Sequence, residues 1–363
     1  MLRRILIVGN FLSSHGRVRG VCEELAPRLR ELGWTVVATS SCLFRPARLI
    51  DMLWTVWRQR HHYDLAQVDV YSGPSFRWAE AVCGLLRNLN RPYILTLHGG
   101  GLPEFARRKN RRVRALLDSA AAVTVPSEYL LDRMSNYRRD LKLLPNAVDL
   151  RCYPLNSHKD LQPRLIWLRA FHEIYNPCMV PRVLARLKDE FPSIRLTMAG
   201  PDKGDSSREA TIATAKKYGV EAHLEFKGLL PKACVSQLLR TGDIFLNTST
   251  VDNAPVSLLE AMAAGLCVVS TDAGGIPYLV KSGKEALLVP VDDDAAMAAA
   301  VRRLLMDQQL VARIRTASLA KANMFDWSMI LPQWEALLAI VADGARAPTQ
   351  PWLRKVPRTP TMI

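Results

Sequence analysis

Short apolar runs alternate with helical patterns along the chain, and this alternation constrains the fold most strongly. Ile5 to Val8 form the first apolar run, and apolar residues at helical spacing follow it up to Gly33. The pattern continues with expected strands at 36–38, 65–70, 93–97 and 121–125 and with expected helices ending near residues 89 and 117. Strands that are separated by helices form parallel sheets. The sequence therefore predicts an α/β protein.

The alternation loosens after Asn146 and restarts near residue 165. The polar, proline-containing stretch LNSHKDLQP at 155–163 marks a boundary, and a second series of strands and helices follows to about residue 306. We predict two Rossmann-like, doubly wound domains facing each other across a cleft where a ligand binds. The expected parts are an N-terminal acceptor-side domain at 1–160, a donor domain at 161–324, a C-terminal helix at 325–345 that packs back across both domains, and a disordered tail at 346–363.

Composition excludes several classes of protein. With 363 residues, of which 49% are hydrophobic, the chain suits two domains that each bury a core. No apolar stretch approaches the roughly 18 to 20 residues of a membrane span. Arg3 and Arg4 before Ile5 imitate a signal peptide, but a short apolar part without a cleavage site favours a buried strand. Seven scattered cysteines without metal-binding spacing predict small core residues in a reducing cytoplasm.

Positive charge is concentrated in the first half of the chain. Residues 1–160 contain 25 Lys and Arg against 14 Asp and Glu, or +11 of the total +15. The strongest basic run, at 107–114, lacks the interleaved aromatic residues that stack on nucleic-acid bases. We therefore expect no nucleic-acid partner and leave two alternatives open, peripheral contact with an anionic membrane and a solvated helix face.

A second basic segment contains apolar residues at helical spacing. Arginines flank the stripe, which is interpreted as core in preference to a membrane contact. The stripe comprises Leu49, Ile50, Leu53, Trp54 and Trp57, beside Arg45, Arg48, Arg58 and Arg60.

The segment at 247–277 has the features of an anion site. A loop with Asp252 and Asn253 follows a strand, and Pro255 begins a helix. The first N–H groups of that helix, on Val256, Ser257 and Leu258, are expected to point into the cleft. Free amides and the helix dipole together attract phosphate. Glu260, about one turn further, is placed to accept hydrogen bonds from a ribose diol.

This segment resembles the signature of the retaining glycosyltransferases of family four, which have the GT-B fold. That family carries two glutamates separated by seven residues; the second is Glu260 here, whereas Asp252 holds the first position. The resemblance implies that Asp252 contacts the transferred sugar, that the backbone at 255–258 binds the diphosphate, and that Glu260 binds the ribose.

Further segments extend the resemblance from Leu2 to about residue 340. Gly16, in the loop after the first strand, matches a glycine that lets the backbone approach the donor. LTLHGGG places His98 where the family keeps a histidine beside the donor sugar, followed by Gly99 and Gly100. LLPNAVD, at 143–149, resembles the segment before the linker.

The segment WLRAFHEIYNP, at 167–177, resembles the one whose arginine and lysine bind the donor phosphates. Arg169 matches the arginine, but Ile174 and Tyr175 occupy the position of the lysine. A missing cation matters because the leaving group gains negative charge as the glycosidic bond breaks. We expect His172, or a basic residue of the first domain, to substitute for it.

Together these features imply a retaining transferase that moves a sugar from a UDP- or GDP-sugar to a saccharide or polyprenyl-linked acceptor. Asp252, His98 and Arg169 are the expected catalytic residues, and the enzyme is expected in the cytoplasm or at the inner face of the membrane. We expect no cofactor or metal, because Asp292–Asp294 is interpreted as the cap of a helix that begins near Ala295. Three alternatives remain: an inactive nucleotide-sugar-binding protein, an epimerase or phosphorylase on the same fold, and a nucleic-acid binder.

Overall fold

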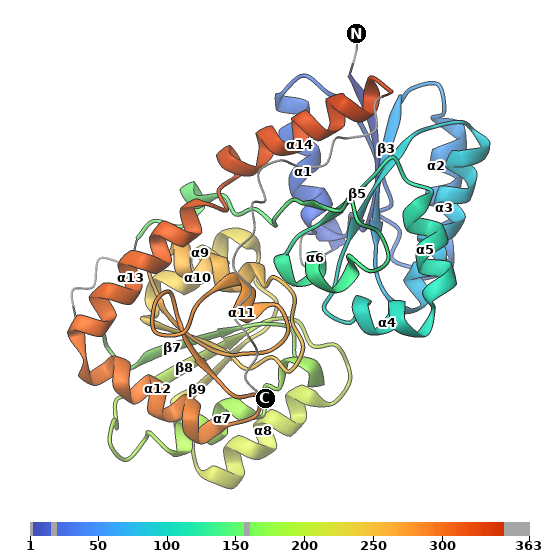
Figure 1. The fold of residues 1–363 in the computed structure, drawn as a ribbon. Coiled ribbons are helices and arrows are strands. Elements are labelled where there is room, and N and C mark those ends of the chain that lie inside the picture. The colour runs from blue at the N-terminus through green and yellow to red at the C-terminus, as the bar shows by residue number, and fades with distance from the viewer. Residues whose placement is uncertain (1–2, 16–19, 156–159, 345–363) are drawn as a thin grey trace.

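The computed structural model describes residues 3–15, 20–155 and 160–344, and its core consists of two separate parallel sheets (Figure 1). The first sheet has the order β2-β1-β3-β4-β5-β6. Its strands are β1 (Arg4–Val8), β2 (Thr35–Thr39), β3 (Leu65–Val70), β4 (Tyr93–Leu97), β5 (Ala122–Val125) and β6 (Lys142–Leu143). Apolar side chains of the central strands are fully buried because helices cover both faces.

The second sheet repeats this architecture with the order β12-β11-β10-β7-β8-β9. Its strands are β7 (Arg164–Leu168), β8 (Arg195–Ala199), β9 (Leu224–Lys227), β10 (Ile244–Asn247), β11 (Cys267–Thr271) and β12 (Leu287–Val289). Every strand pair in both sheets is parallel. The two sheets confirm the α/β fold that the apolar runs predict.

Helices cover the first sheet in two layers. Helix α1 (Val21–Glu31) lies on one face, and α2 (Arg45–Arg58), α3 (Phe76–Asn88) and α5 (Asn110–Asp118) lie on the other (Figure 1). Two shorter helices, α4 (Leu102–Arg108) and α6 (Glu128–Met134), complete the domain. The single helix expected to end near Leu117 is wrong, because Lys109 has φ −124° and ψ 39° and separates α4 from α5.

The second sheet is covered by seven helices that the described residues form. They are α7 (Met179–Ala185), α8 (Ser207–Tyr218), α9 (Lys232–Thr241), α10 (Val256–Ala263), α11 (Ile276–Leu279), α12 (Asp294–Met306) and α13 (Gln308–Asn323). Asp293 accepts a hydrogen bond from the Ala296 N–H at 2.8 Å and caps α12. The predicted capping role is therefore confirmed for Asp293, whereas Asp292 and Asp294 pair with Arg182 and Arg186.

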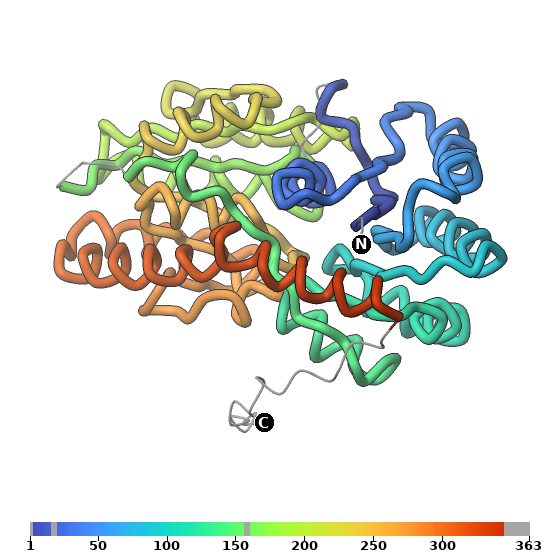
Figure 2. The backbone as a smooth tube through the Cα atoms, turned by 90° about the horizontal axis from the view of Figure 1, so that it is seen from above, coloured from blue at the N-terminus to red at the C-terminus, as the bar shows by residue number. Residues whose placement is uncertain are grey.

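The last described helix, α14 (Trp327–Ala342), returns to the first domain. Figures 1 and 2 show α13 beside the second sheet and α14 beside α1. Trp334 and Leu338 pack in one buried cluster with Ile5 of β1 and with Leu25 and Leu29 of α1. The packing buries the apolar face of α14 against the first domain. The tail predicted at 346–363 lies outside the described residues.

Solvent exposure corrects the interpretation of the stripe on α2. Leu53 packs against the core and Leu49 is half-buried, as a core stripe requires. Ile50, Trp54 and Trp57 are instead 67%, 52% and 46% exposed, and the core interpretation is wrong for them. Among the described residues, no helix is both long and apolar enough to cross a membrane.

The cysteines are all free thiols, but they are not all core residues. Cys22, Cys83 and Cys267 are buried, and burial raises the pKa of the Cys83 thiol to about 12 and that of Cys267 to about 11. Cys152 is exposed, which contradicts the prediction for this thiol. The thiols at 42, 178 and 234 are partly exposed.

We expect Leu338→Ala to lower the free energy of unfolding by about 2–5 kcal/mol, because it leaves a cavity between α14 and the first domain. Leu338 is fully buried. Met329→Ala on the same helix is the control, since Met329 is 56% exposed and its truncation should change stability by less than about 0.5 kcal/mol. Urea unfolding followed by circular dichroism measures both. Equal stabilities would show that α14 does not hold the first domain.

Candidate active site

The loop between β10 and α10 lies where the two domains touch, and glycines enclose its backbone. A Cβ atom on Gly100, after β4 of the first domain, would lie 2.9 Å from the Asp252 carbonyl oxygen. Cβ atoms on Gly274 and Gly275 would lie 2.1 Å from the Asp252 carbonyl oxygen and 1.9 Å from that of Asn253. These approaches are possible only for residues without a side chain. The glycines therefore fix the Asp252 loop against both domains.

Two of the predicted catalytic residues form an ion pair. Arg169 follows β7, the neighbour of β10 in the sheet, and its guanidinium contacts the Asp252 carboxylate. Their side chains are only 13% and 11% exposed. Burial lowers the pKa of Arg169, and the charges of Tyr175 and Glu260 oppose that shift. A phosphate entering the site would compete with Asp252 for the guanidinium.

Tyr175, together with Ile174, stands where the family resemblance places a lysine. Its ring lies over the Arg169 guanidinium, with 4.4 Å between the guanidinium carbon and the ring centroid. Its carbonyl accepts a hydrogen bond from the Thr248 hydroxyl at 2.6 Å, and the Ile174 carbonyl accepts one from the Thr250 N–H at 2.8 Å. Both residues thus support the β10–α10 loop and the arginine, but neither provides a second positive charge.

His172, the first expected substitute for that lysine, has a local structural role. Its Nδ1 accepts a hydrogen bond from the Ile174 N–H at 3.2 Å, which caps the short 3₁₀ helix Glu173–Tyr175. The same nitrogen lies 3.7 Å from an Asp205 carboxylate oxygen. The Nδ1 atom of His172 therefore already has partners in Ile174 and Asp205.

The start of α10 provides hydrogen-bond donors. Within the described residues, the N–H groups of Val256 and Ser257 have no hydrogen-bond partner, and no side chain caps the helix at Pro255. The buried Ser257 hydroxyl is also without a partner there. The Leu258 N–H donates to the Pro255 carbonyl at 3.2 Å, so the prediction of a third free amide is wrong. Two amides remain for an anion.

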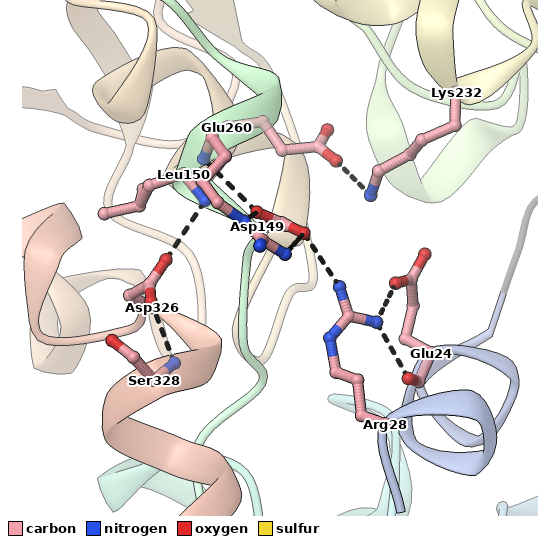
Figure 3. Close-up of polar contacts among 9 residues, drawn as sticks. Glu24, Arg28, Asp149, Leu150, Lys232, Glu260, Asp326 and Ser328 are labelled. Atoms are coloured by element: carbon pink, nitrogen blue, oxygen red, sulfur yellow. Dashed lines mark hydrogen bonds and ion pairs between the residues drawn. The ribbon is translucent and has the colours of Figure 1, made fainter. Parts of the chain in front are cut away.

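Glu260 is buried on α10 and already has two partners. The Tyr153 hydroxyl and the Lys232 ammonium both donate to Oε1 at 2.8 Å. Figure 3 shows the contact with Lys232. Among the described residues, Oε2 receives no hydrogen bond, which leaves it available to a hydroxyl. Burial, together with the charge of Glu260, raises the pKa of Tyr153, so this residue remains a donor at neutral pH.

Lys232 is a site residue that the sequence did not reveal. It is the first residue of α9 and follows Pro231, a position with no predictive pattern. Burial opposes its charge, but attraction to Glu260 and a smaller attraction to Glu24 outweigh this, and the pKa of Lys232 is raised. Glu24 belongs to α1 of the first domain, so the lysine experiences the charges of both domains.

Arg28 connects the same region to the segment between the domains. Its guanidinium contacts the Glu24 carboxylate at 2.7 Å and Asp149 at 3.1 Å (Figure 3). It also lies 4.5 Å from the ring centroid of Trp327 at the start of α14. One side chain therefore joins α1, the connecting segment and α14.

His98 belongs to a polar cluster in the first domain. Its Nε2 lies 2.9 Å from Asp69 Oδ1, which also accepts a hydrogen bond from the Gln67 amide at 2.8 Å. The ring stacks on Tyr71 with 4.9 Å between centroids. Asp69 was missed, although polar residues at 67 and 69 in an otherwise apolar buried strand are a usable signal. Asp69 fixes the orientation of the imidazole ring.

The remaining predicted site residues have different surroundings. Asn253 accepts a short hydrogen bond from the Ser127 hydroxyl of the first domain, and Asn146 donates to the Ala254 carbonyl at 3.2 Å. Gly99 has φ +89°, and a Cβ there would contact nothing within 4 Å. Gly16 lies outside the described residues. No group of three His, Cys, Asp or Glu side chains suited to a metal ion occurs in the described ranges.

Two family models match the chain, and the boundary between their matches lies in the segment that connects the two sheets. Residues 7–151 match the family model described as Glycosyltransferase Family 4. Residues 157–320 match the model described as Glycosyl transferases group 1. Together the two matches include strands β2 to β6 and the end of β1 in the first sheet, all of the second sheet, and the candidate site residues.

Individual relatives are distant. A phosphatidyl-myo-inositol mannosyltransferase from Mycolicibacterium smegmatis is 28% identical over 200 residues, which are 52% of this chain and 49% of that protein. The chain thus spans about half the length of the curated relatives it matches first.

Solved structures agree over nearly the whole fold. Sucrose-phosphate synthase from Thermosynechococcus elongatus superposes with a TM-score of 0.80 at 16% identity, covering 94% of this chain and 100% of that one. Anabaena HepE in complex with UDP and glucose gives 0.74 at 18% identity, covering 93% and 99%. These similarities establish the GT-B architecture. With matches to both family models, the chain belongs to the group 1 glycosyltransferases and carries a family 4 glycosyltransferase domain before its group 1 domain.

Proposed function

We propose that this protein is a retaining glycosyltransferase that transfers a sugar from a UDP- or GDP-sugar to a saccharide or lipid-linked saccharide. The arrangement around the β10–α10 loop carries the proposal. Arg169, the free amides of Val256 and Ser257, and Glu260 all lie at the carboxyl ends of β7 and β10, where ligands bind in open parallel sheets. A diphosphate fits the cation and the amides, and a ribose fits the carboxylate.

Lys232 is proposed as the second cation of the donor site, in place of the missing lysine. Its ammonium is 2.8 Å from Glu260 and its side chain is 37% exposed, so a ligand can reach it. The ribose hydroxyls would bind Glu260 through Oε2 while Lys232 remains on Oε1. In this arrangement the lysine orients the carboxylate and adds positive charge to the nucleotide side of the site.

The chemistry requires stabilisation of the leaving diphosphate. As the bond between the anomeric carbon and the phosphate oxygen breaks, Arg169 and the start of α10 stabilise the developing negative charge. The acceptor hydroxyl attacks the same face, and its proton passes to the departing phosphate oxygen. The configuration is thereby retained without a second carboxylate nucleophile.

His98 and Asp252 are proposed to position the sugar. Asp69 and Tyr71 hold the imidazole ring of His98, and Gly100 brings this loop against Asp252. When phosphate takes over the guanidinium of Arg169, the Asp252 carboxylate is released toward sugar hydroxyls. The proposed reaction needs no metal, since the arginine and the amides supply the electrostatic stabilisation.

Related proteins support the proposed substrates. HepE was solved with UDP and glucose, which supports a nucleotide-sugar donor. One relative is named a phosphatidyl-myo-inositol mannosyltransferase, which supports a lipid-linked acceptor. We place the enzyme in the cytoplasm, where such nucleotide sugars are available.

Replacing Asp252 or Glu260 by Ala should reduce sugar transfer at least about a hundredfold, because each removes a charged hydrogen bond to the donor. Glu260→Ala should also weaken UDP or GDP binding in calorimetry, whereas Asp252→Ala should leave it nearly intact. Glu225→Ala, an exposed carboxylate on the second domain, is the control. Full activity in both site variants would reject the assignment.

Product analysis then separates the alternatives. Transfer requires an acceptor, whereas an epimerase or a phosphorylase acting on sugar phosphate releases an altered sugar or sugar phosphate without one. An inactive binding protein would bind nucleotide and form no product with any acceptor.

Lys232→Gln should weaken binding of UDP or GDP about tenfold, since a charged hydrogen bond contributes about 1.5 kcal/mol or more. Lys227→Gln removes a lysine that pairs with Glu225 on the surface and serves as the matched control. Isothermal titration calorimetry measures both. Equal affinities for the two variants would exclude Lys232 from the donor site.

The neighbouring glycines at 100 and 101 offer a steric test. Gly100→Ala should displace the Asp252 loop and reduce transfer at least about tenfold, because the added Cβ would lie 2.9 Å from the Asp252 carbonyl oxygen. Gly101→Ala should be tolerated, since its nearest neighbour would be the Ser72 hydroxyl at 3.8 Å. Steady-state kinetics of both variants checks this. Similar rates would show that the loop contact does not position the site.

A further inference from the structure

Helix α2 presents apolar side chains to solvent opposite its buried face. Met52 and Val56 point into the core and are 4% and 0% exposed. Ile50, Trp54 and Trp57 follow each other at spacings of four and three residues, which places them on one stripe of the helix. Their exposed fractions are 67%, 52% and 46%. Since the core is already covered, this second apolar stripe needs another explanation.

The stripe continues into the turn before the helix. Leu43 and Phe44, immediately before α2, are 50% and 71% exposed. The rings of Trp54 and Trp57 contact each other with 5.3 Å between centroids. Five large apolar side chains are therefore exposed within fifteen consecutive residues, which is a concentration of the kind that marks interaction sites.

The charges beside this patch are positive. Arg45 and Arg58 at the two ends of α2 are exposed, and the guanidinium of Arg60 lies 4.7 Å from the ring centroid of Trp57. Asp51 is the only acidic residue of α2, and it accepts a hydrogen bond from the Thr39 hydroxyl at 3.1 Å. An apolar stripe bordered by arginines is typical of a helix that lies in a membrane interface.

The basic run at 107–114 belongs to the same side of the domain. Figure 2 shows α2, α3 and the α4–α5 segment in one row along the outer side of the first sheet. Part of the run is neutralised, because Arg107 and Arg108 share Glu104, and Arg112 pairs with Glu80 of α3. Lys109 and Arg111 are exposed and add positive charge to this side.

We propose that α2 and the preceding turn form a docking surface for anionic phospholipid bilayers. The helix would lie parallel to the bilayer, with Phe44, Ile50 and the two tryptophans at the boundary between headgroups and acyl chains. The flanking arginines would contact lipid phosphates. We favour an anionic surface over a protein partner for two reasons. The tryptophans belong to one narrow stripe that arginines border, and this domain carries most of the net positive charge of the chain.

This surface is separate from the donor site, since its ring contacts and hydrogen bonds within the described ranges involve no residue of the β10–α10 loop. One consequence rests on the proposed function: a docked first domain would bring the acceptor side of the cleft to the lipid surface, where a lipid-linked saccharide is found.

Sedimentation with vesicles tests the proposal. The full chain should bind vesicles of phosphatidylcholine mixed with phosphatidylglycerol and bind those of phosphatidylcholine alone much more weakly. Trp54→Ser combined with Trp57→Ser should reduce the bound fraction about tenfold or more, since both rings leave the interface. Met306→Ser is the matched control, because Met306 is 72% exposed on α12 of the second domain. Equal binding by the tryptophan variant and the control would overturn the proposal.

Charge is tested separately. Arg45→Gln combined with Arg58→Gln should reduce binding to the anionic vesicles about thirtyfold, since each arginine near such a surface contributes about 1 kcal/mol. Equal binding to neutral and anionic vesicles would contradict the lipid charge preference. A different outcome would identify a second copy of the chain as the occupant. In that case the wild-type chain would self-associate and bind no vesicles, and the tryptophan variant would lose the self-association. UDP affinity should be the same in all variants. Failure of the membrane proposal would therefore not contradict the proposed donor site.

Discussion

The site depends on one steric constraint, the approach of backbone to backbone around the loop between β10 and α10. Gly274 and Gly275 contact this loop from its own domain, and Gly100 contacts it from the other. Carbonyl oxygens of Asp252 and Asn253 occupy the space where side chains would otherwise stand. Because the loop is held this tightly, the Asp252 carboxylate and the first turn of α10 have fixed positions relative to both sheets.

Charge pairing organises the rest of the site around that loop. Arg169 and Asp252 form an ion pair in a nearly dry environment, where an unpaired charge would cost several kcal/mol. Glu260 is held in the same way by Lys232 and Tyr153. In the proposed donor complex, a phosphate would replace Asp252 at Arg169, whereas Lys232 would remain on Glu260. This exchange at Arg169 would link donor binding to the arrangement of the site.

The connection between the domains is built from polar contacts and one apolar helix. Asp326 accepts a hydrogen bond from the Leu150 N–H at 3.1 Å (Figure 3). The Val148 N–H donates to the Phe325 carbonyl at 2.9 Å. From this junction α14 continues onto the first domain, where Trp334 and Leu338 are buried. The second half of the chain therefore contributes core residues to the first domain, so the two domains are not independent in stability.

The sequence by itself determined the two parallel sheets, the loop with Asp252 and the helix start at Pro255, because apolar periodicity and helix capping are local properties. It also indicated Arg169 and Glu260 through a resemblance between motifs. Only the tertiary structure decided that Arg169 pairs with Asp252, that Lys232 reaches Glu260, and that Asp69 holds His98. Only the tertiary structure showed which side of α2 faces solvent, since a buried and an exposed apolar stripe have the same sequence pattern. These contacts join residues far apart in the chain, and no local pattern specifies which distant side chain will arrive beside them.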